Sequence, residues 1–258
     1  MAQNTMATIT GVYRYPVKGL SAETLINVKV LAGETLPFDR AWAIENGPGR
    51  FDPAAPKHLP KINFLMLMRN EKLASLAAHF DETTETLTLA RAGKPVISGN
   101  LSTKVGRSLI EQFLAAYMKD DLRGPPRIVS APGHSFSDVS AKYLHIVSLE
   151  TIRELERGIG RPIDALRFRP NLVIDGAPPW SEFDWVGRTL TAGDVKLSVL
   201  ERTDRCAATN VDPATGARDM DIPAQLARRW GHTEFSVYAT VIAGGNLVRG
   251  AHIMQGSP

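Results

Sequence analysis

Short alternating runs of apolar and polar residues mark the first hundred positions of the chain. Residues 8–15 alternate and are rich in β-branched and aromatic side chains, which predicts a strand. Residues 25–31 and 41–45 predict two further strands in the same way. Residues 86–90 and 95–97 flank a short turn segment and predict a hairpin.

One helix is predicted with particular clarity near the middle of the chain. Val105, Leu109 and Phe113 fall on one helical face, which predicts a helix over residues 103–119 with Ser102 in the position of an N-cap. The Gly-Pro-Pro sequence at residues 124–126 then indicates a linker, and we expect a domain boundary near it.

The second half repeats this mixture of strands and short helices. Residues 143–147 predict a strand, Ser148 an N-cap, and residues 149–159 a helix, a junction that presents free backbone N–H groups to an anion. The remaining expected elements are a strand at 172–174, a hairpin of 189–191 with 195–200, a helix at 222–230, and a final pair of strands, 235–242 and 246–253, about Gly244 and Gly245. Many short strands with few helices predict a β-rich α+β fold with barrel-like sheets.

Composition narrows the class of protein. With 43% hydrophobic and 22% charged residues, the 258-residue chain has the make-up of a globular protein. The first ten residues lack the pattern of a signal peptide, and no apolar run approaches the roughly 20 residues of a spanning helix. We therefore expect a cytoplasmic protein without a membrane partner.

The charged residues favour small anionic ligands over nucleic acid. The formal net charge is only +3, and 20 of the 30 basic residues are arginine, whose planar fork suits phosphate and carboxylate. Basic residues never occur in runs longer than two, unlike the clustered basic segments of many nucleic-acid binders. Walker-type and Gly-x-Gly-x-x-Gly loops are also missing, so nucleotide binding is not indicated.

Cys206 is the only cysteine, which excludes an intrachain disulfide and a multi-cysteine zinc site. A lone cysteine is most often a small buried hydrophobe. Here Arg202 and Arg205 precede it and favour a thiolate, while the polar Thr203, Asp204 and Thr209 around it do not resemble a core strand. A thiolate in this setting either attacks an electrophile or binds a soft metal. The six histidines occur singly, so a cysteine–histidine pair stays an unsupported alternative.

Basic residues stand at several predicted strand ends. Lys18 follows the first strand and precedes Gly19, which permits a positive φ, and Arg40 lies at a second corner. Arg169 precedes Pro170, which favours an extended backbone at the arginine, and Asn171 follows at the start of a strand. A phosphorylated ligand would need such groups, although periodicity does not show that they converge.

Taken together, the motifs resemble those of MOSC proteins, named after the C-terminal domain of molybdenum cofactor sulfurases. The resemblance rests on Arg205-Cys206-x-x-Thr209-x-Val211-Asp212-Pro213-x-Thr215-Gly216, on Phe168-Arg169-Pro170-Asn171 and on Val237-Tyr238-Ala239 with Gly244-Gly245. Tyr15-Pro16-Val17-Lys18-Gly19-Leu20 and Phe38-Asp39-Arg40-Ala41-Trp42 resemble the N-terminal β-barrel domain that precedes MOSC in proteins such as the mitochondrial amidoxime-reducing components and their bacterial counterparts. This resemblance implies two domains, an N-terminal β-barrel domain over residues 1–120 and a MOSC domain over residues 121–258.

The same resemblance implies a molybdenum cofactor of the molybdopterin type, with the metal bonded to Cys206. It further implies Asp212 beside the cysteine as a catalytic residue. The remaining positions that it assigns to cofactor binding are Lys18, Arg40, Ser148, Arg169, Asn171 and Thr209. Gly19 departs from relatives that carry a serine after the lysine, so one hydroxyl contact would be missing.

Two functions follow from the resemblance. The first is an oxidoreductase that reduces N-hydroxylated or other N-oxygenated small molecules, with electrons from a separate flavin or iron–sulfur protein, because the chain has no four-cysteine ferredoxin-like extension. The second is a carrier that binds or transfers the cofactor, or sulfur on Cys206, without turnover of its own. An unused buried thiol is the third interpretation, and the sequence leaves all three open.

Overall fold

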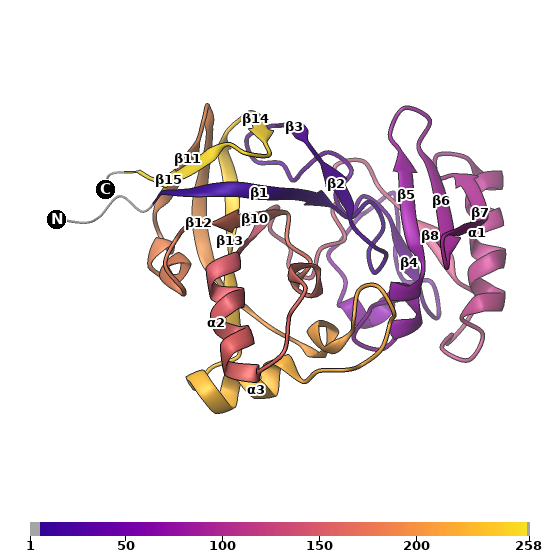
Figure 1. Cartoon of the computed structure of the whole chain (residues 1–258). Helices are drawn as coiled ribbons and strands as arrows, with labels where there is room; N and C mark the ends of the chain where they lie inside the picture. The colour runs from indigo at the N-terminus through magenta and orange to yellow at the C-terminus, as the bar shows by residue number, and fades with distance from the viewer. Residues whose placement is uncertain (1–5, 257–258) are drawn as a thin grey trace.

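Seven strands close into a barrel in the computed structural model, which describes residues 6–256 (Figure 1). They follow one another in the order β10-β9-β13-β12-β11-β15-β1, and β1 pairs with β10 to close the circle. The barrel strands are β1 (Met6–Arg14), β9 (Leu144–Ser148), β10 (Leu172–Asp175), β11 (Thr189–Ala192), β12 (Val195–Asp204), β13 (Glu234–Ala243) and β15 (His252–Gln255). The chain's first described strand is thus part of the same barrel as strands from its last 115 residues.

Alternation of apolar and polar residues explains which side chains of the barrel strands point into the core. In β1 the side chains of Ile9 and Val12 are fully buried, and they join Leu197 and Val237 in one barrel core. The strands β9 and β10 run parallel and are connected through α2 (Leu149–Ile159), as a parallel crossover requires. The short β2 (Glu23–Leu25) extends the sheet beside β1.

A second apolar core lies beside the barrel. Here the antiparallel strands β5 (Ala77–Asp81), β6 (Thr86–Arg91) and β7 (Lys94–Asn100) pack against α1 (Lys104–Tyr117), at the right of Figure 1. Thr103 is the N-cap of α1, and its hydroxyl accepts a hydrogen bond from the Gly106 N–H at 3.1 Å. A Cβ at Gly106 would lie 2.1 Å from the Asn100 carbonyl oxygen, so only glycine lets the helix and β7 approach this closely.

Smaller elements complete the fold. Two two-stranded sheets are formed by β3 with β14 and by β4 with β8, and a third helix, α3, follows the loop of residues 206–219, called the cysteine loop below. Their bounds are β3 (Asn27–Val30), β14 (Gly245–Val248), β4 (Ala43–Glu45), β8 (Arg127–Val129) and α3 (Ile222–Trp230), and the 3-10 turns are η1 (Lys61–Asn63), η2 (Glu71–Ser75), η3 (Ala165–Phe168), η4 (Ser181–Trp185) and η5 (Ala207–Asn210).

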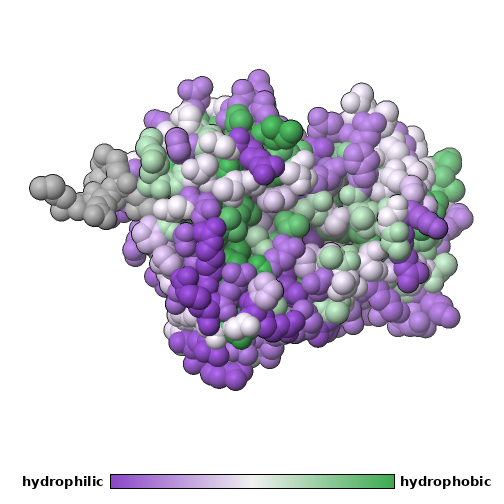
Figure 2. Space-filling model, in the orientation of Figure 1, coloured by the Kyte–Doolittle hydropathy of each residue, from purple (hydrophilic) through white to green (hydrophobic). Residues whose placement is uncertain are grey.

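Figure 2 shows a largely hydrophilic face with a few apolar side chains gathered near β3 and β14, where Ile26 is exposed. None of the helices among residues 6–256 has the length and apolar composition needed to cross a membrane.

The β-rich α+β fold with few helices is confirmed, and three local predictions are wrong. The N-cap of the predicted helix is Thr103 and not Ser102. Residues 25–31 are divided between β2 and β3, with the exposed Ile26 at the break. Residues 235–242 and 246–253 do not pair with each other either.

The reason for this last difference lies at Gly244. A Cβ there would lie 2.6 Å from the Val30 carbonyl oxygen, so the chain passes close to β3 and pairs with it as β14. A turn with Gly250 at φ 93° then separates β14 from β15, which pairs with β1 and β11 instead. The preceding strand β13 pairs with β12 and β9.

Candidate functional site

Cys206 lies in a cleft between the barrel and the N-terminal part of the chain. The lining residues come from segments far apart in sequence, and they are Lys18, Gly19, Arg40, Lys61, Met66, Leu67, Met68, Asp138, Tyr143, His145, Arg167, Phe168, Arg169, Arg205, Cys206, Ala208 and Tyr238. The cleft has a volume of about 90 Å³, and a second cavity of about 90 Å³ adjoins it and shares Gly19, Leu67, Arg167 and Arg169.

A larger cavity of about 520 Å³ lies elsewhere, between residues 29–42 and 130–142. Its walls share no residue with those of the Cys206 cleft. Most of its lining surface is apolar, whereas the smaller cleft gathers a thiol and six cationic side chains. Chemistry and not size therefore identifies the Cys206 cleft as the candidate site.

The backbone around Cys206 is fixed by a tight turn. Cys206 follows β12 and is the N-cap residue of η5, and its side chain stays partly exposed. Thr209 holds the turn, since its backbone N–H and its hydroxyl both donate to the Cys206 carbonyl, at 3.1 and 2.9 Å. Arg205 lines the cleft, but Arg202 does not: it pairs with Glu234 at 3.2 Å and stacks on Phe183. Of the two arginines expected to favour a thiolate, only Arg205 thus faces the cleft.

Arg169 brings a half-buried positive charge into the cleft, and no carboxylate among the described residues pairs with it. Its guanidinium lies 4.1 Å from the centre of the Tyr15 ring and donates to the Leu20 carbonyl at 2.8 Å. Nη2 is buried and has no hydrogen-bond partner within the described chain. Burial lowers the pKa of Arg169 to about 10. An anion that entered the cleft would meet this unused donor.

The Arg169 backbone contradicts the expectation drawn from the following proline. It is left-handed, with φ 54° and ψ 52°, and not extended. The turn of η3 closes here, because the Arg169 N–H donates to the Leu166 carbonyl at 3.0 Å. Contacts of the side chain with Tyr15 and Leu20 then outweigh the local preference of a residue before proline.

Arg205 is held by neutral acceptors. Its Nη1 donates to His145 Nε2 at 3.2 Å and its Nη2 to the Phe168 carbonyl at 3.2 Å, while its buried Nε has no partner in the described chain. Burial, followed by the charge of Arg205, holds the pKa of His145 far below its ordinary value. The imidazole is therefore neutral, and the charge of Arg205 is left uncompensated beside Cys206.

Two lysines share one carboxylate across the cleft. Lys18 Nζ donates to the Phe136 carbonyl at 2.8 Å and to Asp138, and Lys61 Nζ lies 3.4 Å from the other oxygen of Asp138. Burial lowers the pKa of Lys18, and Asp138 offsets this only in part. Burial would raise the pKa of Asp138, but Lys18 and then Lys61 outweigh it and lower that pKa to about 2.

Arg40 completes the cationic lining. Its guanidinium pairs with the buried Asp39, packs over the Tyr15 ring at 4.8 Å and donates to the Arg169 carbonyl at 3.3 Å. The structure thus brings Lys18, Arg40, Arg169 and Cys206 together, although they lie up to 188 positions apart.

Four other residues expected at the site do not line the cleft. Asn171 is buried and links strands, accepting from the His145 N–H and donating to the Tyr13 carbonyl. Ser148 is fully buried as the N-cap residue of α2, and its hydroxyl has no partner in the described chain. Thr209 is buried beneath the Cys206 turn, and both carboxylate oxygens of Asp212 are engaged by loop residues and by Arg167.

Sequence reasoning missed several lining residues. Lys61 begins the short turn η1 and Asp138 lies in a loop, and neither belongs to a motif. Tyr143 directly precedes β9, and Tyr238 lies in β13 between two core residues. Only one signal was available: Tyr238 falls in the Val-Tyr-Ala stretch singled out above. Groups of three or more His, Cys, Asp or Glu side chains able to hold a metal by themselves are missing from residues 6–256.

Two known protein families match most of the described chain. Residues 132–255 match the MOSC domain family, and residues 6–121 match the MOSC N-terminal beta barrel domain family. Human mitochondrial amidoxime-reducing component 1 is 23% identical over 249 residues, which cover 87% of this chain and 72% of that protein. Human molybdenum cofactor sulfurase is 24% identical over 272 residues, covering 89% of this chain but only 29% of the sulfurase. Among solved structures, the YuaD protein from Bacillus subtilis aligns over the whole of both chains with 12% identity and a TM-score of 0.47.

Proposed function

Because the chain belongs to the MOSC family and carries that family's N-terminal β-barrel domain, we propose that it binds a molybdenum cofactor and reduces N-oxygenated small molecules. Cys206 would be the protein's ligand to the metal. A separate flavin or iron–sulfur protein would supply the electrons. The similarity to a protein named amidoxime-reducing component supports this choice of substrate class.

The observation that carries the proposal is that one cleft holds the Cys206 thiol and the uncompensated positive charges of Arg169 and Arg205. A thiolate is a soft ligand that suits molybdenum, and guanidinium and ammonium groups suit the phosphate of a molybdopterin. Arg169 Nη2 and Arg205 Nε are buried donors without partners in the described chain, which is costly unless a ligand satisfies them. The donor set of the cleft therefore fits this cofactor.

Each residue would have a separate task. When bound, the cofactor would supply the two electrons that, together with two protons, would convert an N–OH group to N–H and water. Arg169 and Lys18 would hold the phosphate, and Arg205 would add positive charge beside Cys206. The neutral His145 would keep the Arg205 guanidinium oriented through their 3.2 Å contact.

A carrier of the cofactor or of sulfur is the second candidate. The partly exposed Cys206 and the similarity to molybdenum cofactor sulfurases support it. The match covers less than a third of the sulfurase, so a transfer activity of the whole relative does not follow for this chain. The two candidates share the binding site and differ only in turnover.

Metal analysis tests the shared part of the proposal. Protein produced in a host that makes the cofactor should contain about one molybdenum per chain, and Cys206→Ser should contain almost none because the thiolate ligand is lost. Arg169→Ala should lower occupancy, whereas Arg202→Ala, an arginine outside the cleft, should not. Wild-type protein without molybdenum in such a host would refute the proposal.

Turnover then separates the enzyme from the carrier. Loaded wild-type protein should reduce benzamidoxime to benzamidine with a chemical electron donor, and Cys206→Ser should not. A loaded protein that does not turn over would exclude the reductase and favour the carrier. Arg202→Ala again serves as the control, because its partners Glu234 and Phe183 lie outside the cleft.

A further inference from the structure

Arg167 lies between the cleft and the loop that follows Cys206. Its side chain is only 3% exposed, yet it extends from η3, which precedes Cys206 by 38 residues. The carboxylate of Asp164 accepts from the Leu166 N–H at 2.8 Å and its carbonyl from the Arg167 N–H at 3.1 Å, so the turn that presents Arg167 is well defined.

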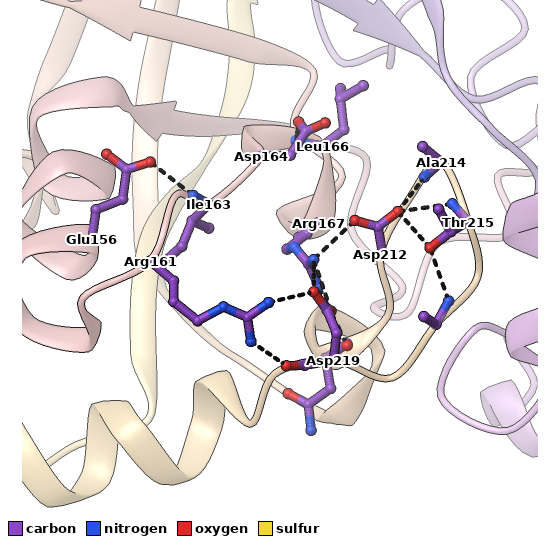
Figure 3. Close-up of polar contacts among 12 residues, drawn as sticks. Glu156, Arg161, Ile163, Asp164, Leu166, Arg167, Asp212, Ala214, Thr215 and Asp219 are labelled. Carbon is purple, nitrogen blue, oxygen red and sulfur yellow. Dashed lines mark hydrogen bonds and ion pairs between the residues drawn. The ribbon is translucent and has the colours of Figure 1, made fainter.

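The guanidinium contacts three points of the cysteine loop (Figure 3). Nη1 donates to the Asn210 carbonyl at 3.3 Å, and Nη2 donates to Asp212 at 3.1 Å and to Asp219 at 3.0 Å. Asn210 is the last residue of η5, the turn that begins at Cys206. One side chain thus ties the start, the middle and the end of the loop together.

Asp212 connects Arg167 to the turn at residues 212–215. One of its oxygens accepts from the N–H groups of Ala214 and Thr215, at 3.0 and 2.8 Å, and from the Thr215 hydroxyl at 2.9 Å, while the other accepts from Arg167. The carboxylate is therefore fully engaged in shaping the loop. Burial would raise the pKa of Asp212, but the hydrogen bonds from Thr215 and Ala214, together with the charge of Arg167, outweigh it and lower that pKa.

The arrangement needs the shape of arginine as well as its charge. A planar fork can donate in several fixed directions, whereas a lysine ammonium is a single point charge. One guanidinium faces the two carboxylates of Asp212 and Asp219, and Arg161 balances the excess negative charge by contacting Asp219 at 3.1 Å. Arg161 is 52% exposed, and its hydrogen bonds within the described chain go to the carbonyl and carboxylate of Asp219 at the end of the loop. It is therefore a control for the contacts that Arg167 alone makes with Asn210 and Asp212.

We propose that Arg167 is a positioning residue that fixes the loop of residues 206–219 and so sets the direction in which Cys206 faces the cleft. Its importance for metal binding rests on the function proposed above, but its effect on the loop does not. Removal of Arg167 would leave the Asn210 carbonyl without this donor and two neighbouring carboxylates without their shared cation.

The test uses cofactor-free protein and compares Arg167→Ala, Arg167→Lys and Arg161→Ala with the wild type. Hydrogen exchange is measured by mass spectrometry across residues 206–219, and Cys206 alkylation by iodoacetamide gives the thiol's accessibility. Arg167→Ala should speed exchange in the loop about tenfold, because lost hydrogen bonds to charged groups shift a local opening equilibrium by roughly that factor. Exchange in β9 and α2 should stay unchanged, and the alkylation rate should rise with loop opening.

The control variants decide the interpretation. Arg161→Ala should match the wild type in both measurements within about twofold, since an exposed ion pair contributes little. Arg167→Lys should recover at most part of the change, and full recovery would overturn the role assigned to the fork. Equal behaviour of Arg167→Ala and Arg161→Ala would overturn the positioning role itself. If Arg167→Ala does not fold, loop exchange and Cys206 alkylation are compared between Arg167→Lys and Arg161→Ala instead.

A final measurement separates this inference from the proposed function. Loaded wild-type and Arg167→Lys proteins are compared by Mo(V) electron paramagnetic resonance at equal molybdenum content. Broadened or multiple signals in the variant support a loosened Cys206, and identical spectra contradict it. If the wild type takes up no molybdenum, the proposed function fails, while the exchange and alkylation results still decide the role of Arg167.

Discussion

Replacing Asp138 with asparagine should reveal how the cleft balances its own charge. Asp138 lies between Lys18 and Lys61, and its pKa is lowered to about 2 from the ordinary 3.8. That shift corresponds to about 2 kcal/mol at face value. The side chain is 45% exposed, so solvent screening reduces the stabilisation to about 1 kcal/mol.

The sign of the pH dependence follows from the lowered pKa. A carboxyl group with a depressed folded-state pKa stabilises the protein above its unfolded pKa, and the stabilisation is lost as the pH falls through the folded value. Wild type should therefore exceed Asp138→Asn by about 1 kcal/mol in unfolding free energy at pH 7. The difference should shrink below pH 4 and disappear near pH 2. Urea unfolding at pH 7, 4 and 3 measures it.

The same substitution should also strengthen anion binding. Without the carboxylate, Lys18 and Lys61 face an entering anion with no competing charge, and we expect inorganic phosphate to bind about fivefold more tightly at low salt. Calorimetric titration checks this. Asp120→Asn is the control, because Asp120 lies 3.9 Å from Lys72 with 70% of its side chain exposed. Equal stability of Asp138→Asn and wild type at pH 7, or unchanged phosphate affinity, would refute the reasoning.

Three further substitutions probe the fold. Gly106→Ala should destabilise the protein by about 3 kcal/mol or more in urea unfolding, since its Cβ would overlap the Asn100 carbonyl; a loss below 1 kcal/mol would show that α1 shifts easily. Thr103→Ala should cost about 1 kcal/mol in the same assay through loss of the N-cap, and no loss would mean that solvent caps α1 equally well. Burial raises the pKa of Glu182 to about 7, so wild-type stability should fall by about 3 kcal/mol as the pH rises from 4.5 to 7, and Glu182→Gln should abolish that slope; a slope that persists would assign it to another group.

Local patterns in the sequence predicted elements well where they depend on a single segment. The periodicity of residues 103–119 and 149–159 predicted α1 and α2 within two residues, and Gly19 adopts the positive φ expected of it. The strands β5 and β8 were missed because β5 carries polar residues on its exposed side and β8 has only three residues. Their stability comes from partners, which a single segment does not reveal.

The same distinction between local and long-range information applies to the candidate site. Cys206 could be singled out from its surroundings, but the convergence of Lys18, Arg40 and Arg169 on it depends on the closure of the barrel. That closure pairs β1, which leads to Lys18, with β10, which follows Arg169. The family resemblance anticipated the grouping, whereas periodicity could not. Neither the resemblance nor the periodicity indicated Lys61 and Asp138, since neither residue lies in a motif.

Backbone conformation at Arg40 and Arg169 explains why the cleft cannot be derived from local preference. Arg40 and Arg169 both have φ 54°, in the left-handed region that costs a residue other than glycine about 1 kcal/mol or more. The Arg40 N–H donates to the Tyr15 carbonyl at 2.7 Å, and both guanidinium groups pack against the Tyr15 ring. Contacts with one aromatic residue from the N-terminal segment thus offset strain at two positions 129 residues apart. Tyr15 is fully buried, and its replacement by leucine should release both arginines and lower molybdenum occupancy while leaving Cys206 in place.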